Sequence, residues 1–185
     1  MLPGVVIRPE LPQDIAAISD VTELAFRRPD KQPCEQFIIE ELRRSNALSL
    51  SLVAESNGKI VGHVAFSPVQ ISDGSLQWFG LGPIAVTPDL QRQGIGRGLI
   101  ETGLAALRGK GVAGCVVLGS PKFYGRFGFN HRPDCILDGV PPHHFQSLTF
   151  GGRPAVGKVS YHRAFTREVR TSHGQADASE DSAGC

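Results

Sequence analysis

One segment of the sequence combines hydrogen-bond donors with glycine at the start of a predicted helix: Gln91, Arg92, Gln93, Gly94, Ile95, Gly96 and Arg97. Backbone N–H groups in the first turn of a helix have no partner within the helix and lie at the positive end of its dipole, so they bind anions such as phosphate. No acidic residue occurs between Asp89 and Glu101, although acidic side chains usually stabilise a helix start. The segment predicts a site in which a bound pyrophosphate supplies this negative charge.

The glycines of this helix start exclude simpler explanations. Gly94, Gly96 and Gly98 each cost roughly 1 kcal/mol relative to alanine in a helix interior, and close packing on a sheet accounts for one glycine rather than three. A dinucleotide-binding GxGxxG motif would require glycine at Leu99, and a Walker loop would require Ser or Thr after Lys110, where the sequence has glycine. We therefore expect another fold to bind the nucleotide.

The strand that precedes this helix, at residues 76–86, contains poor strand formers. Gly80, Gly82 and Pro83 weaken or remove ladder hydrogen bonds, and together they predict a bulge. A bulged strand leaves backbone groups unpaired, and an extended ligand can bind to them as an added strand.

The remaining pattern predicts an α/β domain with a mixed, mostly antiparallel sheet and helices on both faces. Strands are predicted at residues 5–10, 49–56, 59–71, 76–86 and 112–120, and helices at about 15–28, at 37–42 and from 95 onward. Asn57-Gly58 predicts a hairpin turn. The strand–helix–strand unit around Gly94 predicts two parallel strands. A short helical turn and a further strand are expected over residues 121–129.

Length and composition fit one domain, expected at residues 1–169, followed by a disordered polar tail at 170–185. The net charge of +1 disfavours nucleic acid as a partner. Since no apolar run reaches the roughly 20 residues of a membrane helix and no signal peptide is apparent, we expect no membrane partner and a cytoplasmic location. The cysteines lack CxxC spacing, and adjacent His143 and His144 lack the spacing of a helical metal pair, so no metal is expected.

The motif at residues 91–96 resembles the Q/R-x-x-G-x-G/A signature of the GNAT superfamily of acyl-CoA-dependent N-acyltransferases. The resemblance covers residues 5 to about 129, with the order of elements given above. Further segments resemble the YhbS-type acetyltransferases of this superfamily: residues 82–86, 116–129, 140–145 and 161–165. The resemblance implies the GNAT fold, with parallel strands 4 and 5 splayed apart, and an N-acetyltransferase that takes acetyl-CoA as cosubstrate.

The resemblance also implies the contacts of the coenzyme. The pyrophosphate would lie at residues 91–97, and the pantetheine arm would bind the backbone of Ile84, Ala85 and Val86 between the splayed strands. Ser120 and Phe123 are implied as further coenzyme contacts. Tyr124 matches the tyrosine that protonates the CoA sulfur in many members, and a phenol can donate that proton. A strand N–H near Ala85 would polarise the acyl carbonyl.

The general base and the acceptor are left open by the sequence. Many family members carry a Glu on the bulged strand, but residues 76–86 contain no carboxylate. A water chain, backbone carbonyls or His63 are the alternatives, and a lone histidine on a strand is more often structural. The acceptor is a small-molecule or protein amine, selected by loops at residues 27–36, 131, 141–145 and 151–152. A homodimer and a CoA-binding regulatory module without turnover are kept as alternatives.

Overall fold

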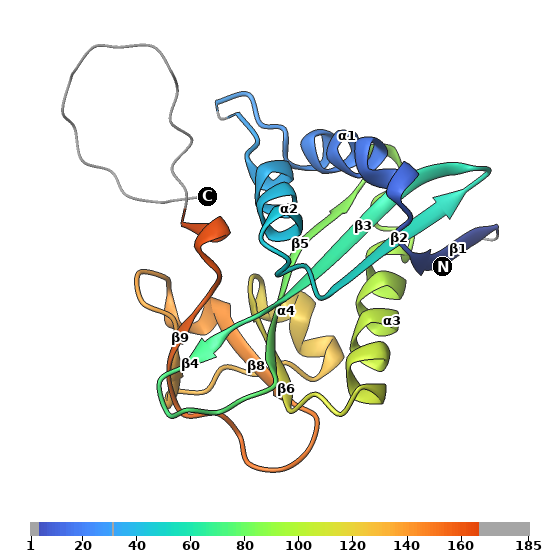
Figure 1. Ribbon diagram of the computed structural model, residues 1–185. Helices are drawn as coiled ribbons and strands as arrows, with labels where there is room; N and C mark the ends of the chain where they lie inside the picture. The colour runs from blue at the N-terminus through green and yellow to red at the C-terminus, as the bar shows by residue number, and fades with distance from the viewer. Residues whose placement is uncertain (1–3, 31, 167–185) are drawn as a thin grey trace, which may run out of the picture.

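The computed structural model describes residues 4–30 and 32–166, and it contains two sheets with helices on both faces of the larger one (Figure 1). The larger sheet has the order β1-β2-β3-β5-β6-β8, and the smaller has the order β4-β9-β7. In the larger sheet β5 and β6 are parallel, and the other neighbours are antiparallel. The elements are β1 (Val5–Pro9), α1 (Ile15–Phe26), α2 (Glu35–Arg44), β2 (Leu50–Ser56), β3 (Lys59–Pro68), β4 (Gln70–Ile71), β5 (Trp78–Val86), α3 (Ile95–Gly109), β6 (Gly114–Leu118), α4 (Pro121–Tyr124), β7 (Cys135–Ile136), β8 (Phe145–Thr149) and β9 (Gly157–Ser160).

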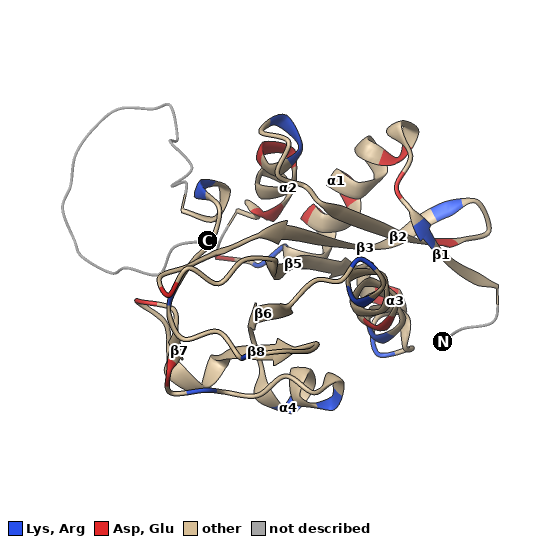
Figure 2. Cartoon of the chain, turned by 60° about the horizontal axis from the view of Figure 1, so that its bottom comes forward, with Lys and Arg blue, Asp and Glu red and all other residues tan. Residues whose placement is uncertain are grey.

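The helices cover opposite faces of the large sheet. Figure 2 shows α1 and α2 on one face and α3 on the other. Helix α3 buries a stripe of aliphatic side chains against the sheet: Ile95, Leu99, Ile100, Leu104 and Leu107. Its close approach requires a glycine at one position, since a Cβ on Gly103 would lie 2.4 Å from Cε2 of Phe66. The prediction of a mixed sheet covered on both faces is confirmed.

Strand β6 separates two hydrophobic cores because its side chains alternate between the faces. Cys115 and Val117 pack in the core beneath α3, whereas Val116 packs with Trp78 in a second core on the opposite face. Cys115 is thus a buried core residue. The smaller sheet covers the second core, to which it contributes Ile71 and Val159.

Two predicted strands differ from the structure. The strand expected at residues 59–71 ends at Pro68, and Gln70–Ile71 pairs with β9 in the smaller sheet. The strand expected after residues 121–124 does not form. Residues Gly125–Phe127 make a 3-10 turn, Gly128 reverses the chain at φ +91°, and Asn130 makes an isolated bridge to Ser147. Strand β8 pairs with β6 instead. Because the structure has the additional short strand β4, the parallel pair that was predicted as strands 4 and 5 is numbered β5 and β6.

Three expectations concern the tail, a membrane partner and a metal. The predicted polar tail, residues 170–185, lies outside the described residues. Within residues 4–30 and 32–166, no helix has the length and hydropathy needed to cross a membrane. The same residues contain no cluster of three or more His, Cys, Asp or Glu side chains arranged to hold a metal ion.

Candidate functional site

The start of α3 has the geometry of an anion site. Gly94 caps the helix at φ +87°, a left-handed conformation that favours glycine, and no side chain caps the first turn. The amide of Gly98 donates to the carbonyl of Gly94 at 2.9 Å, which closes the first turn. The first turn contains no acidic residue. Its N–H groups therefore present the positive end of the helix dipole without a negative side chain beside it.

Packing within the protein does not explain Gly96. A Cβ at this position would lie 3.7 Å from Cγ2 of Val86 and 3.9 Å from Cδ1 of Ile84, which are ordinary contacts. Gly94 is explained by its φ and Gly103 by Phe66, but neither reason applies to Gly96. The contacts also place the side chains of Ile84 and Val86 beside the first turn of α3.

The polar side chains predicted to bind phosphate make other contacts in the free protein. Nε2 of Gln91 donates to the carbonyl of Val86 at 3.1 Å, and Nε2 of Gln93 donates to that of Asp89 at 3.0 Å. Nε of Arg97 donates to Glu101 at 2.8 Å. Arg92 lies in the preceding loop at φ +60°. The structure thus gathers these side chains around the helix start without aiming them at one point.

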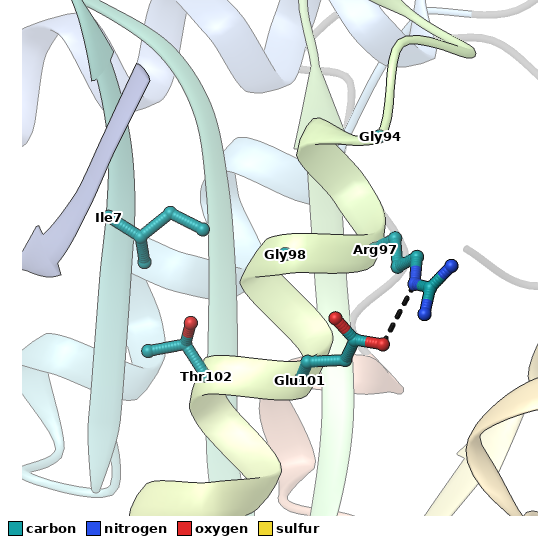
Figure 3. Close-up of a pocket in the computed structure, with 6 residues that line it drawn as sticks. All are labelled: Ile7, Gly94, Arg97, Gly98, Glu101 and Thr102. Carbon is teal, nitrogen blue, oxygen red and sulfur yellow. Dashed lines mark hydrogen bonds and ion pairs between the residues drawn. The ribbon is translucent and has the colours of Figure 1, made fainter. Parts of the chain in front are cut away.

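A hollow of about 500 Å³ lies along α3 on the side of β1. Figure 3 shows that Gly94, Gly98 and Thr102 line it from the helix, that Ile7 faces it from β1, and that Arg97 extends outward to meet Glu101. The Arg97–Glu101 pair is solvent-exposed and contributes little to stability. Arg97 can therefore exchange this partner for another anion at small cost.

Strands β5 and β6 separate beside this helix start. Their parallel pairing covers Trp78, Phe79 and Gly80 opposite Gly114, Cys115 and Val116. Beyond Gly80, β5 continues to Val86 without pairing to β6 in the described part of the chain. We call the gap between the two strands beyond Gly80 the opening. The prediction that the parallel strands splay is confirmed.

A bulge marks the beginning of the opening. Phe66 of β3 lies opposite Leu81 and Val64 lies opposite Ile84, so Gly82 and Pro83 together oppose one residue of β3. Gly82 has φ +142°, which glycine adopts readily. This is the bulge predicted from Gly80, Gly82 and Pro83. It turns alternate backbone groups of residues 81–86 toward the opening, because the others pair with β3.

Tyr124 lies where β6 leads into α4. The amides of Phe123 and Tyr124 both donate to the carbonyl of Ser120 at 3.0 Å, which forms the helical turn. A Cβ on Gly119 would lie 2.4 Å from Cε2 of Tyr124, so the ring rests on a glycine backbone. Phe123 and Phe129 contact the ring edge to face, with centroids 5.0 and 6.0 Å away.

The environment of Tyr124 keeps its phenol protonated. Burial, and to a smaller extent the neighbouring Cys115 thiol, raise the pKa of Tyr124 to about 12. Its hydroxyl has no hydrogen-bond partner within residues 4–30 and 32–166, although the residue is only 8% exposed. A protonated phenol with no partner can donate a proton to a ligand group that reaches it.

His63 is buried on the other face of the sheet, with 0% exposure. Its Nε2 lies 2.8 Å from Oγ of Ser51, which also bonds Glu10. Burial lowers the pKa of His63 to about 4, with a raising contribution from Glu10 and a smaller lowering one from Arg43. The ring therefore stays neutral at pH 7. These contacts account for His63 as a structural residue, and they do not aim Nε2 at the opening.

Because His63 is neutral in the fold, we expect it to make stability depend on pH. Its folded pKa of about 4 lies below the usual 6.5, so the unfolded chain takes up the proton first and stability falls from about pH 6.5 to pH 4. The loss amounts to about 3 kcal/mol. Urea unfolding at several pH values should show this fall in the unmodified protein and a shallower one in His63→Gln. Equal slopes in the two proteins would contradict the assignment.

Comparison with known proteins finds one family and close structural relatives. The family described as Acetyltransferase (GNAT) domain matches residues 6–132. The Escherichia coli K12 protein named "Uncharacterized N-acetyltransferase YhbS" is 35% identical over 170 residues, which cover 87% of this chain and 98% of that protein.

Two solved structures resemble the whole described fold. A GNAT family acetyltransferase of Brucella melitensis, solved in complex with acetyl-CoA, has 47% identity and a TM-score of 0.77, and the match covers 87% of this chain and 97% of that one. Escherichia coli YhbS, solved in complex with CoA, has 33% identity and a TM-score of 0.83, with coverage of 90% and 94%.

Proposed function

Because the chain belongs to the GNAT family of acetyltransferases, we propose that it transfers the acetyl group of acetyl-CoA to a primary amine by direct attack, with Tyr124 as the general acid. The observation that carries this proposal is the opening between β5 and β6, which begins at Gly80 and runs beside the acid-free start of α3. Relatives of 47% and 33% identity were solved with acetyl-CoA and CoA, which supports the choice of cosubstrate.

The described residues fit the coenzyme in three ways. The first turn of α3 offers N–H groups to the pyrophosphate, and Gly96 leaves its approach clear. Gln91, Arg92, Gln93 and Arg97 surround that turn with donors. The backbone of Ile84, Ala85 and Val86 offers hydrogen bonds to the pantetheine arm, as in strand addition. We also assign Ser120, the N-cap residue of α4, and Phe123 of that helix as coenzyme contacts.

The reaction requires three roles. A neutral amine attacks the thioester carbonyl, a C–N bond forms, and the resulting tetrahedral adduct loses the C–S bond. Tyr124 gives its proton to the departing sulfur, and its phenolate is neutralised afterwards from solvent. A backbone N–H of β5 stabilises the oxyanion. The proton lost by the amine passes to water, because His63 is engaged with Ser51 on the other face.

Loops of the fold select the acceptor. We assign selectivity to residues 27–36, to His131, and to residues 141–145 and 151–152. His131 and His143 lie together, with ring centroids 4.8 Å apart, so two of these segments meet. Small metabolites, an antibiotic and a protein amino group are all compatible with them.

The proposal is tested by coenzyme binding and by turnover. Calorimetric titration should show binding of acetyl-CoA and CoA and none of NAD or ATP, since the site is formed by an opening that matches a pantetheine arm. Release of CoA is then followed with a library of primary amines, and at least one amine should accelerate it. Binding of NAD without acetyl-CoA would refute the proposal. Tight acetyl-CoA binding with no turnover across the library would favour the regulatory module instead.

A further inference from the structure

Two buried hydroxyl groups near the opening have no hydrogen-bond partner within residues 4–30 and 32–166. They are Oη of Tyr161 and Oγ of Ser67. A buried hydroxyl without a partner is unfavourable, since its water contacts are lost and nothing replaces them. Such groups in a folded protein therefore call for an explanation. The function proposed above uses neither residue.

Both residues lie beside Gly80, the last residue of β5 that pairs with β6. A Cβ on Gly80 would lie 2.4 Å from Cε1 of Tyr161 and 3.1 Å from Cγ1 of Val69. The Tyr161 ring thus occupies the space that a side chain at position 80 would need. Ser67 lies directly opposite Gly80 across the β3–β5 pair. Directly opposite residues have Cβ positions about 5 Å apart on the same face, so Ser67 borders the same space.

Tyr161 and Tyr124 lie on opposite faces of the sheet. Tyr124 packs in the core beneath α3, together with Cys115, whereas Tyr161 packs against the second core, together with Trp78. Burial raises the pKa of Tyr161, and the neighbouring Cys115 and Tyr124 contribute to the rise across the sheet.

The orientation of the coenzyme follows from α3. Its first turn lies beside Val86 and Ile84, at the end of the opening away from Gly80, so the proposed function places the pyrophosphate at that end. An arm that runs along β5 from Val86 carries its reactive end toward Gly80, where the strands meet. The acyl group is thus directed to the end of the opening where Tyr161 and Ser67 lie.

We propose that Tyr161 and Ser67 form the polar end of the acyl site, and that the Tyr161 hydroxyl donates a hydrogen bond to the carbonyl oxygen of the bound acetyl group. This inference rests on the proposed function. A carbonyl oxygen accepts two hydrogen bonds, so the phenol leaves room for a second donor from the backbone of β5. Free CoA has a thiol and no carbonyl at this point. Tyr161 therefore favours acetyl-CoA over CoA, which is the product that must leave.

The test is titration of the purified full chain with acetyl-CoA and with CoA. Tyr161→Phe keeps the ring on Gly80 and removes only the hydroxyl. We expect the Kd for acetyl-CoA to rise about tenfold, which is the size of one hydrogen bond, while the Kd for CoA stays within twofold. Ser67→Ala should change the ratio of the two Kd values in the same direction. Ser49→Ala, an exposed serine of the neighbouring strand region, is the matched control and should change neither Kd.

The thermal midpoint of the free variant separates this role from a structural one. Because the hydroxyl has no partner in the described fold, Tyr161→Phe should melt at the same temperature as the unmodified protein or higher. An unchanged Kd for acetyl-CoA would overturn the inference, and so would equal weakening of both ligands or a lowered midpoint. If the unmodified protein bound neither ligand, the proposed function itself would fail.

Discussion

The Tyr124→Phe enzyme should turn over about 10²- to 10⁴-fold more slowly than the unmodified enzyme, because it keeps the ring and loses the proton donor. This corresponds to roughly 3 to 5 kcal/mol in the barrier. The hydroxyl of Tyr124 has no partner within the described residues, and burial keeps it protonated with a pKa of about 12. The measurement is kcat with the amine identified by the CoA-release screen.

Binding measurements decide what a loss of turnover means. The Kd for acetyl-CoA should hardly change in Tyr124→Phe, because the ring still packs on Gly119 and against Phe129. A large loss of affinity would make Tyr124 an anchoring residue instead. An unchanged kcat, with chemistry shown to limit the rate, would mean that water protonates the thiolate.

The second large effect is expected at the start of α3. Gly96→Leu should weaken acetyl-CoA binding about 100-fold, because the side chain would cover the N–H groups that hold the pyrophosphate. This loss of affinity corresponds to two charge-assisted hydrogen bonds, each of which contributes about 1.5 kcal/mol to the free energy of binding. The fold should tolerate the change, since a Cβ at position 96 meets nothing closer than 3.7 Å and leucine is a better helix former than glycine. Titration with acetyl-CoA provides the measurement.

Gly109→Leu is the matched control for this variant. It places the same side chain at the other end of α3, where a Cβ would meet no atom within 4 Å. Its Kd for acetyl-CoA should equal that of the unmodified protein, and both variants should keep their thermal midpoints. If Gly96→Leu bound acetyl-CoA normally, the start of α3 would not be the pyrophosphate site.

Local sequence rules predicted the features that are formed by neighbouring residues. The helix after Gly94 and the bulge at Gly82 and Pro83 follow from local residue types, whereas the splaying of the parallel strands was implied by the resemblance to the GNAT superfamily. The prediction of a strand within residues 121–129 was wrong, because closely spaced aromatic residues are also typical of strands. Their rings contact one another around a helical turn instead, and Gly128 then reverses the chain.

Features that depend on distant residues could not be read from the sequence. The smaller sheet joins Gln70 to Ser160, ninety positions away along the chain, through strands of two to four residues. Tyr161 gains its position from Gly80, which lies 81 positions away in the sequence. Gln91 was predicted to face phosphate, yet its amide holds the carbonyl of Val86. Local spacing contains no information on such contacts.

Because β5 and β6 pair over only three residues, the large sheet is divided into two parts, here called plates. One plate contains β1, β2, β3 and β5, the other contains β6 and β8, and three residue pairs from Trp78 to Gly80 join them. The junction is tight, since a Cβ on Gly114 would lie 2.4 Å from Cη2 of Trp78. An extended ligand that bonds to both plates would restore the missing ladder and stiffen the junction. Binding of such a ligand in the opening would therefore make the whole sheet more rigid.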